Sequence, residues 1–281
     1  MIKEKIAVIG GDLRILEAAK ALAIKGYSVF VYGIDVREGS LGSANEAKSL
    51  EEALKNAGLV ILPIPYSRDD GILNAPLSTH PIKLSELWEL ADDGVAIAAG
   101  MADGIPSKFR VFDYLKDEEF ALRNAAASVE GAIAVAIRET DFTLLSSKCL
   151  VLGYGRIGKL LSGHLRDLGA DVTVFARSPL DRVRSEISSI RALDYSSLAR
   201  EAETADIIFN TVPTTLVTRS VLEGANREMV IIDLSSSPGG VDRHAADSFG
   251  IKTVTALGLP GKFSPKSAGK IIASCAESLI L

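Results

Sequence analysis

The chain has 281 residues, which predicts about two domains at the usual ~150 residues per domain. Its net charge of −5 argues against a protein that binds the phosphate backbone of nucleic acids. The most apolar stretches, such as residues 94–101, are far shorter than the about 18 residues of a membrane span, and no signal-peptide pattern opens the sequence. We therefore expect a cytoplasmic protein that binds neither nucleic acid nor a membrane.

Short apolar runs alternate along the chain with longer segments whose apolar residues recur at helical spacing. In the first half, a strand at 6–9 precedes a helix at 13–24, and further strands follow at 28–32, 59–62 and 95–98. In the second half, a strand at 149–152 precedes a helix at 159–168, and further strands follow at 172–175, 207–210, 230–234 and 253–256. This alternation, with strands apolar on both faces, predicts an α/β fold of parallel sheets flanked by helices.

The two halves also repeat one another. When residues 6–35 are placed over residues 149–178, Gly10 falls on Gly153 and Gly26 falls on Gly169. Each pair of glycines frames a helix between two strands, which predicts two Rossmann-like domains rather than one extended sheet. We expect these domains at residues 1–125 and 148–265.

A helix and linker at residues 126–147 are expected to join the two domains. Ser128 is a candidate N-cap for this helix, which would run through Ile137 with Glu130 in its first turn. Residues 266–281 are predicted to form a returning C-terminal helix that packs against the first domain.

One glycine motif carries a chemical prediction. Gly153, Gly155 and Gly158 follow a strand and open a helix, with Arg156 and Ile157 between the last two glycines. The first glycine permits a tight turn, the second lets a pyrophosphate approach the backbone, and the third lets the helix pack against the strand. The helix N-terminus then supplies N–H donors, so this loop is predicted to bind a dinucleotide.

The residues after the next strand indicate which dinucleotide is bound. A site that prefers NAD(H) usually ends this strand with a carboxylate that binds the ribose hydroxyls. Here the strand ends in Ala176, Arg177 and Ser178, which include a cation and a hydroxyl that could bind a 2′-phosphate. We therefore expect NADP(H) as the cofactor, although Arg177 could also be a solvated residue at a strand end.

Further candidates follow the fourth and fifth strands of the second domain, at the sheet edge where ligands of this fold bind. Thr211, Val212, Pro213 and Leu234 are expected to contact the cofactor, and Ser237 is expected to contact the substrate. Each loop alone could instead be ordinary turn chemistry.

The first repeat lacks the dinucleotide pattern. Asp12 and Ile15 stand where the second and third glycines would be, so a pyrophosphate would be repelled and the helix would be held away from the strand. The N-terminal domain is therefore expected to be Rossmann-shaped without holding the dinucleotide, and its loop is expected to face an interdomain cleft and the substrate.

Other catalytic chemistries find little support in the sequence. No histidine among His80, His164 and His244 has a convincing carboxylate partner near the sixth strand, which weakens a 2-hydroxyacid dehydrogenase mechanism. Cys149 and Cys275 are expected to be buried structural residues, and no spacing indicates a metal site.

Taken together, these motifs resemble the A subunits of dipicolinate synthase from spore-forming bacteria. Residues 66–83 depart from the pattern of that family. The matching segments run along nearly the whole chain: 6–12 with Arg14 and Glu17, 61–63, 129–131, 136–137, 140–141, 151–158, 176–178, 210–213, 233–240, 258–261, 265–266 and 268–269.

The resemblance implies an NADP-dependent oxidation of dihydrodipicolinate, a product of the lysine pathway, to dipicolinate. It also implies that the partner is the flavoprotein-like B subunit of dipicolinate synthase, and that the protein works in the mother-cell cytoplasm during sporulation. A homo-oligomer is expected as well.

This chemistry requires groups that bind a dicarboxylate and a base that accepts a proton. Arg14, Ser237 and Lys266 are the candidates for binding the substrate carboxylates, with Lys266 also a candidate catalytic group. Asp12 and Glu130 are the candidate proton acceptors. The alternative is that Asp12 caps a helix, Glu130 complements a helix dipole and Lys266 is solvated.

Two other functions remain open. The chain could be another two-domain NADP-dependent dehydrogenase that acts on a hydroxy or imino acid. It could also be a non-catalytic NADP(H)-binding component of a flavoprotein complex.

Overall fold

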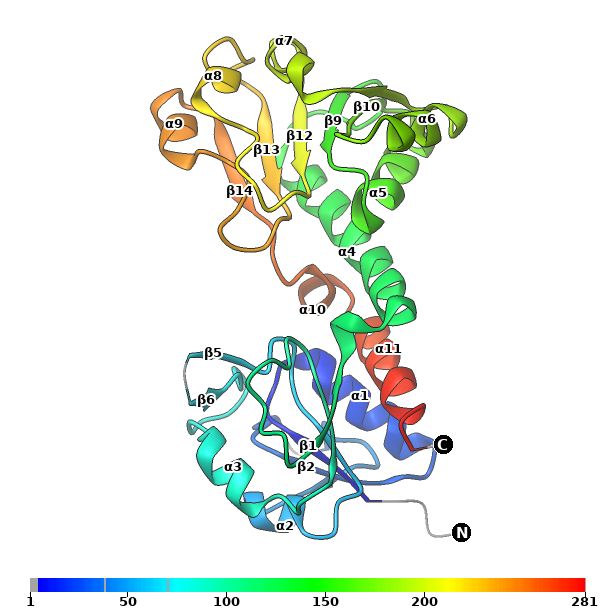
Figure 1. The fold of residues 1–281 in the computed structure, drawn as a ribbon, viewed down its shortest axis with the longest axis vertical. Helices are drawn as coiled ribbons and strands as arrows, with labels where there is room; N and C mark the ends of the chain where they lie inside the picture. Colours follow the sequence, from blue (N-terminus) through cyan, green and yellow to red (C-terminus); the bar gives the residue numbers. More distant parts are fainter. Residues whose placement is uncertain (1–4, 38, 70, 281) are drawn as a thin grey trace. The chain divides into compact units, whose positions relative to one another are not determined.

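The chain forms two compact α/β units in the computed structural model, which describes residues 5–37, 39–69 and 71–280 (Figure 1). Unit 1 comprises Met1–Asn124 together with Pro260–Leu281, and unit 2 comprises Ala125–Leu259. Each unit is built on its own six-stranded parallel sheet. The predicted fold class is therefore confirmed.

The sheet of unit 1 has one helical layer on each face. Its strands, in sheet order, are β3 (Asn45–Glu46), β2 (Ser28–Tyr32), β1 (Lys5–Ile9), β4 (Leu59–Ile61), β7 (Ala96–Ala99) and β8 (Arg110–Asp113). A separate antiparallel hairpin consists of β5 (Ser67–Asp69) and β6 (Ile72–Leu73). The helices are α1 (Leu13–Ile24), α2 (Leu50–Leu54), α3 (Leu84–Leu90), η1 (Tyr114–Lys116), α10 (Leu259–Phe263) and α11 (Pro265–Glu277).

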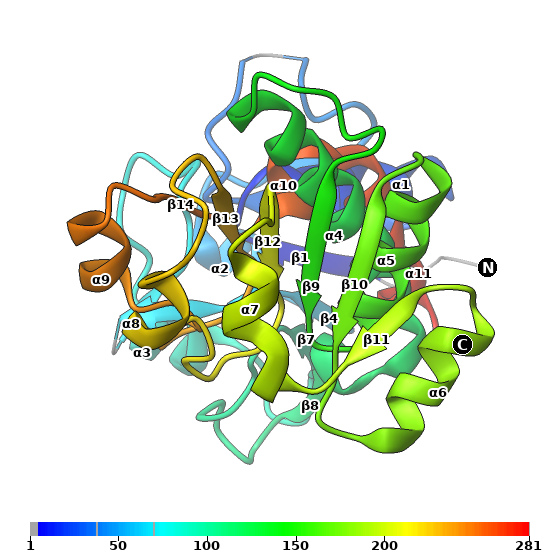
Figure 2. The same ribbon diagram turned by 90° about the horizontal axis from the view of Figure 1, so that it is seen from above.

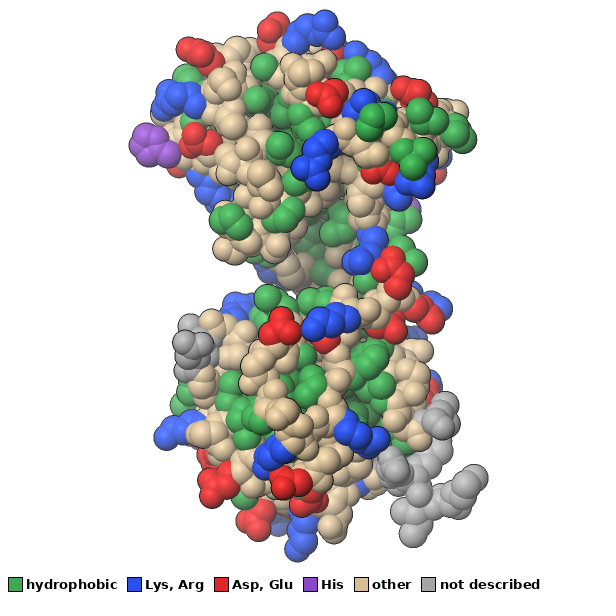
Figure 3. All heavy atoms as spheres, viewed as in Figure 1, with side chains coloured by type: hydrophobic (Ala, Val, Ile, Leu, Met, Phe, Trp, Pro, Cys, Tyr) green, Lys and Arg blue, Asp and Glu red, His purple; other side chains and the backbone are tan. Residues whose placement is uncertain are grey.

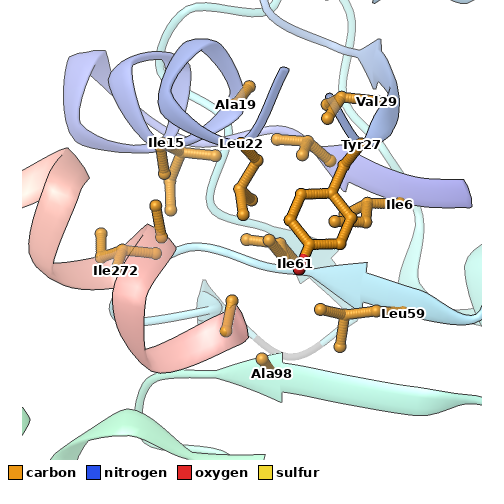
Figure 4. Packing of buried hydrophobic residues seen from close by; sticks show 14 of the residues in the cluster. Ile6, Ile15, Ala19, Leu22, Tyr27, Val29, Leu59, Ile61, Ala98 and Ile272 are labelled. Carbon is orange, nitrogen blue, oxygen red and sulfur yellow. The ribbon is translucent and has the colours of Figure 1, made fainter. Parts of the chain in front are cut away.

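Alternate residues of the unit 1 strands point to two different cores. Ile6 and Val8 pack against α1 and α11, whereas Ala7 and Ile9 pack against α2 and α3. Figure 4 shows Ile272 of α11 near Ile15 of α1, in the cluster that also contains Ile6 of β1 and Ile61 of β4. The C-terminal helix therefore completes the core of the N-terminal unit.

Unit 2 follows the same plan. Its strands, in the sheet order visible in Figure 2, are β11 (Arg191–Leu193), β10 (Asp171–Phe175), β9 (Lys148–Leu152), β12 (Ile207–Asn210), β13 (Val230–Asp233) and β14 (Lys252–Thr255). The helices are α4 (Glu118–Glu139), α5 (Arg156–Asp167), α6 (Pro179–Ile187), η2 (Tyr195–Ser197), α7 (Leu198–Ala202), α8 (Arg219–Leu222) and α9 (Arg243–Ser248). Helices α4 and α5 cover one face of this sheet, and α7, α8 and α9 cover the other.

The helix between the two sheets begins earlier than the sequence predicted. α4 begins at Glu118, where the Asp117 carboxylate accepts a hydrogen bond from the Phe120 N–H at 2.6 Å. Ser128 is therefore not the N-cap, and Glu130 lies near the middle of the helix, not in its first turn. The capping aspartate and the acidic first turn give a start signal ahead of the apolar stretch that the prediction relied on.

Among the described helices, α4 alone is long and apolar enough to cross a membrane by length and composition. Its residues Val129, Ala132, Val135 and Ala136 belong to the core of unit 2. Packing within the unit therefore accounts for its apolar face.

On the face shown in Figure 3, acidic and basic side chains are interspersed.

Candidate functional site

The glycine loop of unit 2 lies at the carboxyl end of β9. Gly153 has a φ of +99°, which L side chains rarely adopt, and its N–H donates to the Phe175 carbonyl oxygen at 2.9 Å. A Cβ on Gly153 would lie 2.5 Å from Thr211 Oγ1 and 2.8 Å from Val212 Cγ2. The loop is therefore held tightly against both the β10 end and the segment after β12.

The other two glycines have opposite environments. A Cβ on Gly158 would lie 2.1 Å from the Gly153 carbonyl oxygen, so α5 starts in direct contact with the loop. Gly155 is the N-cap of α5, and a Cβ there would meet nothing within 4 Å. Arg156 and Ile157 form the first turn of α5 behind it. An open N-terminus next to a packed glycine fits the predicted binding of a pyrophosphate.

The turn after β10 carries the residues expected to distinguish the two nicotinamide dinucleotides. Ala176 is buried, and its N–H donates to the Leu193 carbonyl oxygen at 3.0 Å. Arg177 is exposed, and Ser178 is the N-cap of α6, where its Oγ accepts from the Asp181 N–H at 3.4 Å. The turn therefore presents a cation and a capped helix N-terminus without a carboxylate of its own.

Two further residues contact this turn or the strand end before it, and no sequence motif predicted them. The Arg182 guanidinium donates to the carbonyl oxygens of Ala176 and Arg177, at 2.8 and 3.0 Å. Tyr195 follows β11 and stacks on Phe175 with the ring centroids 6.2 Å apart. Arg182 lies five residues beyond the turn's arginine on a polar helix, and Tyr195 follows a three-residue strand, so neither carries a recognisable signal.

The electrostatics of Tyr195 link it to the same turn. Burial raises the pKa of Tyr195, while the positive charge of Arg177 and a hydrogen bond to the Gly153 backbone act in the opposite direction. Tyr195 therefore lies close to both the glycine loop and the arginine turn.

The loops after β12 and β13 are joined by a buried polar cluster of Asn210, Asp233 and Ser235. Asn210 Nδ2 donates to Asp233 Oδ1 at 2.9 Å, and Ser235 Oγ donates to the same oxygen at 2.6 Å. The Gly240 N–H donates to the other carboxylate oxygen, Oδ2, at 3.3 Å. A buried carboxylate is thus stabilised by hydrogen bonds, and it fixes the start and the end of the loop between Asp233 and Gly240.

This cluster also places the cofactor candidates that follow these strands. Thr211 Oγ1 donates to the Leu152 carbonyl oxygen at 2.7 Å, and the Leu234 N–H donates to the Asn210 carbonyl oxygen at 2.8 Å. Val212 lies against Gly153 and is followed by the exposed Pro213. Ser237 is exposed in the loop that the cluster fixes. The structure therefore gathers the cofactor candidates of unit 2 along the carboxyl edge of one sheet.

In unit 1, Asp12 and Arg14 are bound to each other. The Asp12 carboxylate is the N-cap of α1 and accepts from the Arg14 N–H at 2.9 Å. Arg14 Nη2 donates to Asp12 Oδ2 and to the Ile64 carbonyl oxygen, both at 2.8 Å. Only 12% of the Arg14 side chain and 34% of the Asp12 side chain are exposed. A substrate carboxylate would therefore share this guanidinium with Asp12.

The return of the chain to unit 1 brings a third segment to this ion pair. A Cβ on Gly261 would lie 3.0 Å from Arg14 Nε and 3.2 Å from Asp12 Oδ2. Lys266 follows in the first turn of α11, where it is exposed and makes no ion pair within the described part of the chain. Lys266 is therefore more available than Arg14 to bind an anion.

In unit 1, side chains cover the sheet edge that corresponds to the open edge of unit 2. A Cβ on Gly10 would lie 2.7 Å from Leu73 Cδ2, and a Cβ on Gly33 would lie 2.3 Å from Ile82 Cδ1. These two glycines correspond in the repeat to Gly153 and Ala176 of unit 2. The chain between β6 and α3 thus occupies the sheet edge at which a dinucleotide would bind. This covering is a physical reason, additional to Asp12 and Ile15, for expecting no dinucleotide in unit 1.

Glu130 is exposed on α4, and its side chain makes no hydrogen bond or ion pair within the part of the chain that the structure describes. No group of three or more His, Cys, Asp or Glu side chains that could hold a metal ion occurs among the described residues.

Comparison with known proteins agrees with this division into two sheets. Residues 5–108 match the model of the N-terminal domain of the dipicolinate synthase A subunit. Residues 126–232 match the NAD binding domain of D-isomer specific 2-hydroxyacid dehydrogenases. Across both units, the chain is 30% identical to the dipicolinate synthase A subunit of Bacillus subtilis (strain 168), covering 98% of this chain and 95% of that protein. The chain belongs to the family of dipicolinate synthase A subunits.

Solved structures of this family are also similar. The crystal structure of the dipicolinate synthase A subunit from Bacillus halodurans has a TM-score of 0.90 at 28% identity, covering 100% of this chain and 99% of that chain. The corresponding crystal structure from Bacillus subtilis has a TM-score of 0.87 at 29% identity, covering 99% and 96%. The resemblance seen in the sequence motifs is therefore confirmed. The dehydrogenase-type domain indicates an oxidoreductase with a nicotinamide cofactor.

Proposed function

We propose that this protein catalyses the NADP-dependent oxidation of dihydrodipicolinate to dipicolinate in the cytoplasm of a sporulating cell. The family supports the product, and the dehydrogenase-type domain supports the reaction class. The chain belongs to a family of A subunits, which supports the dipicolinate synthase B subunit as its partner. The observation that carries the choice of NADP(H) is the turn after β10, in which Arg177 and Ser178 stand without a carboxylate.

The residues present fit a bound dinucleotide. Gly155 leaves the N-terminus of α5 open to the pyrophosphate, and Arg177 supplies positive charge where a 2′-phosphate is expected. Thr211, Val212 and Leu234 lie on loops that are fixed at the same sheet edge. When bound, the oxidised nicotinamide ring supplies the hydride acceptor.

The reaction removes a hydride and a proton from the dihydropyridine ring, and the ring becomes aromatic. With a bound nicotinamide as the hydride acceptor, a carboxylate of this chain would accept the proton. The Glu130 side chain makes no hydrogen bond or ion pair in the described part of the chain, whereas Asp12 would have to loosen its hydrogen bonds with Arg14. Glu130 is therefore our first candidate base and Asp12 the second.

The substrate is a dicarboxylate, so it needs two sets of donors. Lys266 offers an exposed ammonium, and Ser237 offers an exposed hydroxyl on a fixed loop. Arg14 is largely occupied, and its contribution would be to orient Asp12. We propose Lys266 and Ser237 as the first contacts of the substrate carboxylates.

The test is a direct assay of the purified chain with NADP+ and freshly generated dihydrodipicolinate. Dipicolinate and NADPH are followed together against a control without enzyme, with NAD+ and the Arg177→Ala variant beside it. Equal amounts of both products, with the variant impaired mainly in its KM for NADP+, are the expected result.

Other outcomes point to the alternatives. Tight NADPH binding with no dipicolinate above the control, whether or not the B subunit is present, would exclude the proposed reaction. Turnover of a hydroxy or imino acid in a substrate panel would then indicate a different dehydrogenase. Formation of dipicolinate only after the B subunit is added would show that the oxidation requires the complex.

A further inference from the structure

The side chain of Arg182 on α6 contacts the turn that presents Arg177. Its Nη1 donates to the carbonyl oxygens of Ala176 and Arg177, at 2.8 and 3.0 Å, and lies 3.3 Å from Asp194 Oδ2. The side chain is 25% exposed, so it is mostly covered although it starts from a surface helix. One cationic nitrogen therefore contacts the backbone after β10 and the side chain after β11.

The two carbonyl groups belong to the turn that presents Arg177. They are consecutive in the chain, and Ser178 then begins the capped helix α6. Charge-assisted hydrogen bonds are stronger than neutral ones, so a guanidinium bound to both carbonyls restricts this turn to one conformation. Without it, both carbonyl oxygens would turn to water, and the direction of the Arg177 side chain would be less defined.

The contact with Asp194 extends this restraint to the neighbouring strand end. The Asp194 carboxylate also accepts from the Ser196 N–H at 3.1 Å, which caps the short helix η2. Tyr195 lies in that helix and is close enough to Arg177 for the two to interact electrostatically. Arg182 thus contacts both the arginine turn and the aspartate that caps the helix containing Tyr195.

We propose that Arg182 is a positioning residue for dinucleotide selectivity, which acts by fixing the turn that aims Arg177 at the 2′-phosphate. This inference rests on the proposed function, because it assumes that the protein prefers NADPH. Arg182 acts through Arg177, so its loss should affect NADPH far more than NADH. A purely structural role would weaken the binding of both nucleotides alike.

The experiment measures the Kd of NADPH and of NADH by fluorescence titration, together with the thermal midpoint, without turnover. In Arg182→Met, the Kd for NADPH should rise about tenfold or more while the Kd for NADH changes less than about twofold. Arg184→Met is the matched control. It removes a guanidinium from the same helix, but Arg184 pairs with Asp181 at 3.0 Å and not with the turn. This control should leave both Kd values unchanged.

A double-mutant cycle with Arg177→Met separates positioning from direct binding. If Arg182 acts through Arg177, adding Arg182→Met to Arg177→Met should not change the ratio of the two Kd values any further. Additive effects would show that Arg182 binds the phosphate independently and would overturn the positioning role. An equal loss of both nucleotides in Arg182→Met would overturn it as well.

The wild-type protein distinguishes this inference from the function on which it rests. If the wild type binds NADH as tightly as NADPH, the proposed NADP dependence itself fails. If the wild type prefers NADPH and Arg182→Met retains that preference, only the role of Arg182 is overturned.

Discussion

Gly158 contacts Gly153 so closely that a Cβ on Gly158 would lie 2.1 Å from the Gly153 carbonyl oxygen. Real Cβ atoms essentially never approach an oxygen this closely, so any side chain at position 158 forces α5 away from β9. A Cβ on the nearby Gly155 would have nothing within 4 Å. One motif therefore contains a glycine required by packing and a glycine whose free space suits a ligand.

This contrast predicts different outcomes for two alanine variants. Gly158→Ala should lower the free energy of unfolding by about 1–3 kcal/mol and weaken NADPH binding, because the helix start must move. Gly155→Ala should cost about 1 kcal/mol or less, since alanine is only a poorer N-cap, yet weaken NADPH binding at least about tenfold. Urea unfolding and fluorescence titration measure the two quantities.

Gly163→Ala is the matched control on the same helix, because a Cβ at Gly163 also meets nothing within 4 Å. This variant should be more stable by about 0.5–1 kcal/mol and bind NADPH normally. Normal NADPH binding by Gly155→Ala would contradict the assignment of the open N-terminus as the pyrophosphate site.

The second prediction concerns the two candidate bases. Glu130→Gln should lower kcat at least about a hundredfold with the Kd for NADPH unchanged, because general-base catalysis contributes effects of this size. Asp12→Asn keeps the helix cap but removes the charge that faces Arg14, so it should lower stability as well as activity. Steady-state kinetics and thermal unfolding would be measured on both variants. Full activity in Glu130→Gln would exclude Glu130 as the base.

Much of this architecture could be predicted because apolar periodicity and the repeat act at short range. The expected strands at 149–152 and 207–210 correspond to β9 (Lys148–Leu152) and β12 (Ile207–Asn210). The glycine spacing likewise identified the loop, because the close contact of Gly158 with Gly153 lies within one strand–helix unit. Patterns of this kind are local, so a single sequence carries them.

What could not be predicted depends on contacts between distant segments. The Asp12–Arg14 pair is local, but its contacts with Ile64 and Gly261 come from segments far away in the chain. The covering of Gly10 and Gly33 by Leu73 and Ile82 is of the same kind. The start of α4 is a different case. Asp117 signals it locally, but the more apolar residues from Ser128 onwards dominated the prediction.

The third prediction concerns the buried carboxylate of Asp233, which is 2% exposed. Asp233→Ala would remove the acceptor that the donors of Asn210, Ser235 and Gly240 share, so the free energy of unfolding should fall by about 2–4 kcal/mol. Asp242→Asn is a control, because that residue only caps α9 and asparagine also caps helices well. Equal stability of the two variants in urea would show that the cluster is not a structural unit.

The fourth prediction is a pH dependence at Asp35. Hydrogen bonds from the Thr79 hydroxyl and N–H hold the pKa of Asp35 below its usual value. The folded pKa is lower than the unfolded pKa, so this contribution is present above the unfolded value and is lost as the pH falls through the folded value. Because Asp35 is exposed, the contribution should stay below about 1 kcal/mol.

Unfolding in urea between about pH 6 and pH 3 tests this prediction. The free energy of unfolding of Asp35→Asn should fall less steeply with decreasing pH than that of the wild type. Asp93→Asn removes a carboxylate whose side chain is 80% exposed and should leave the curve almost unchanged. Parallel curves for the wild type and Asp35→Asn would refute the proposed linkage.

The last prediction concerns the two thiols. Burial raises the pKa of Cys149 to about 11. Burial, with the nearby carboxylates of Asp117 and Glu119, raises the pKa of Cys275 to about 12. The thiolate is the reactive form, and at about pH 8 only about a thousandth or less of either thiol would be ionised.

The native protein should therefore react slowly with a disulfide reagent, whereas in the protein unfolded in guanidinium both thiols should react quickly. Cys275 is partly exposed and Cys149 is buried, so the reagent should reach Cys275 first in the native protein, and Cys275→Ser should abolish that early phase. A thiol that reacts within seconds in the native protein at neutral pH would show that one of these sites is more open than its packing indicates.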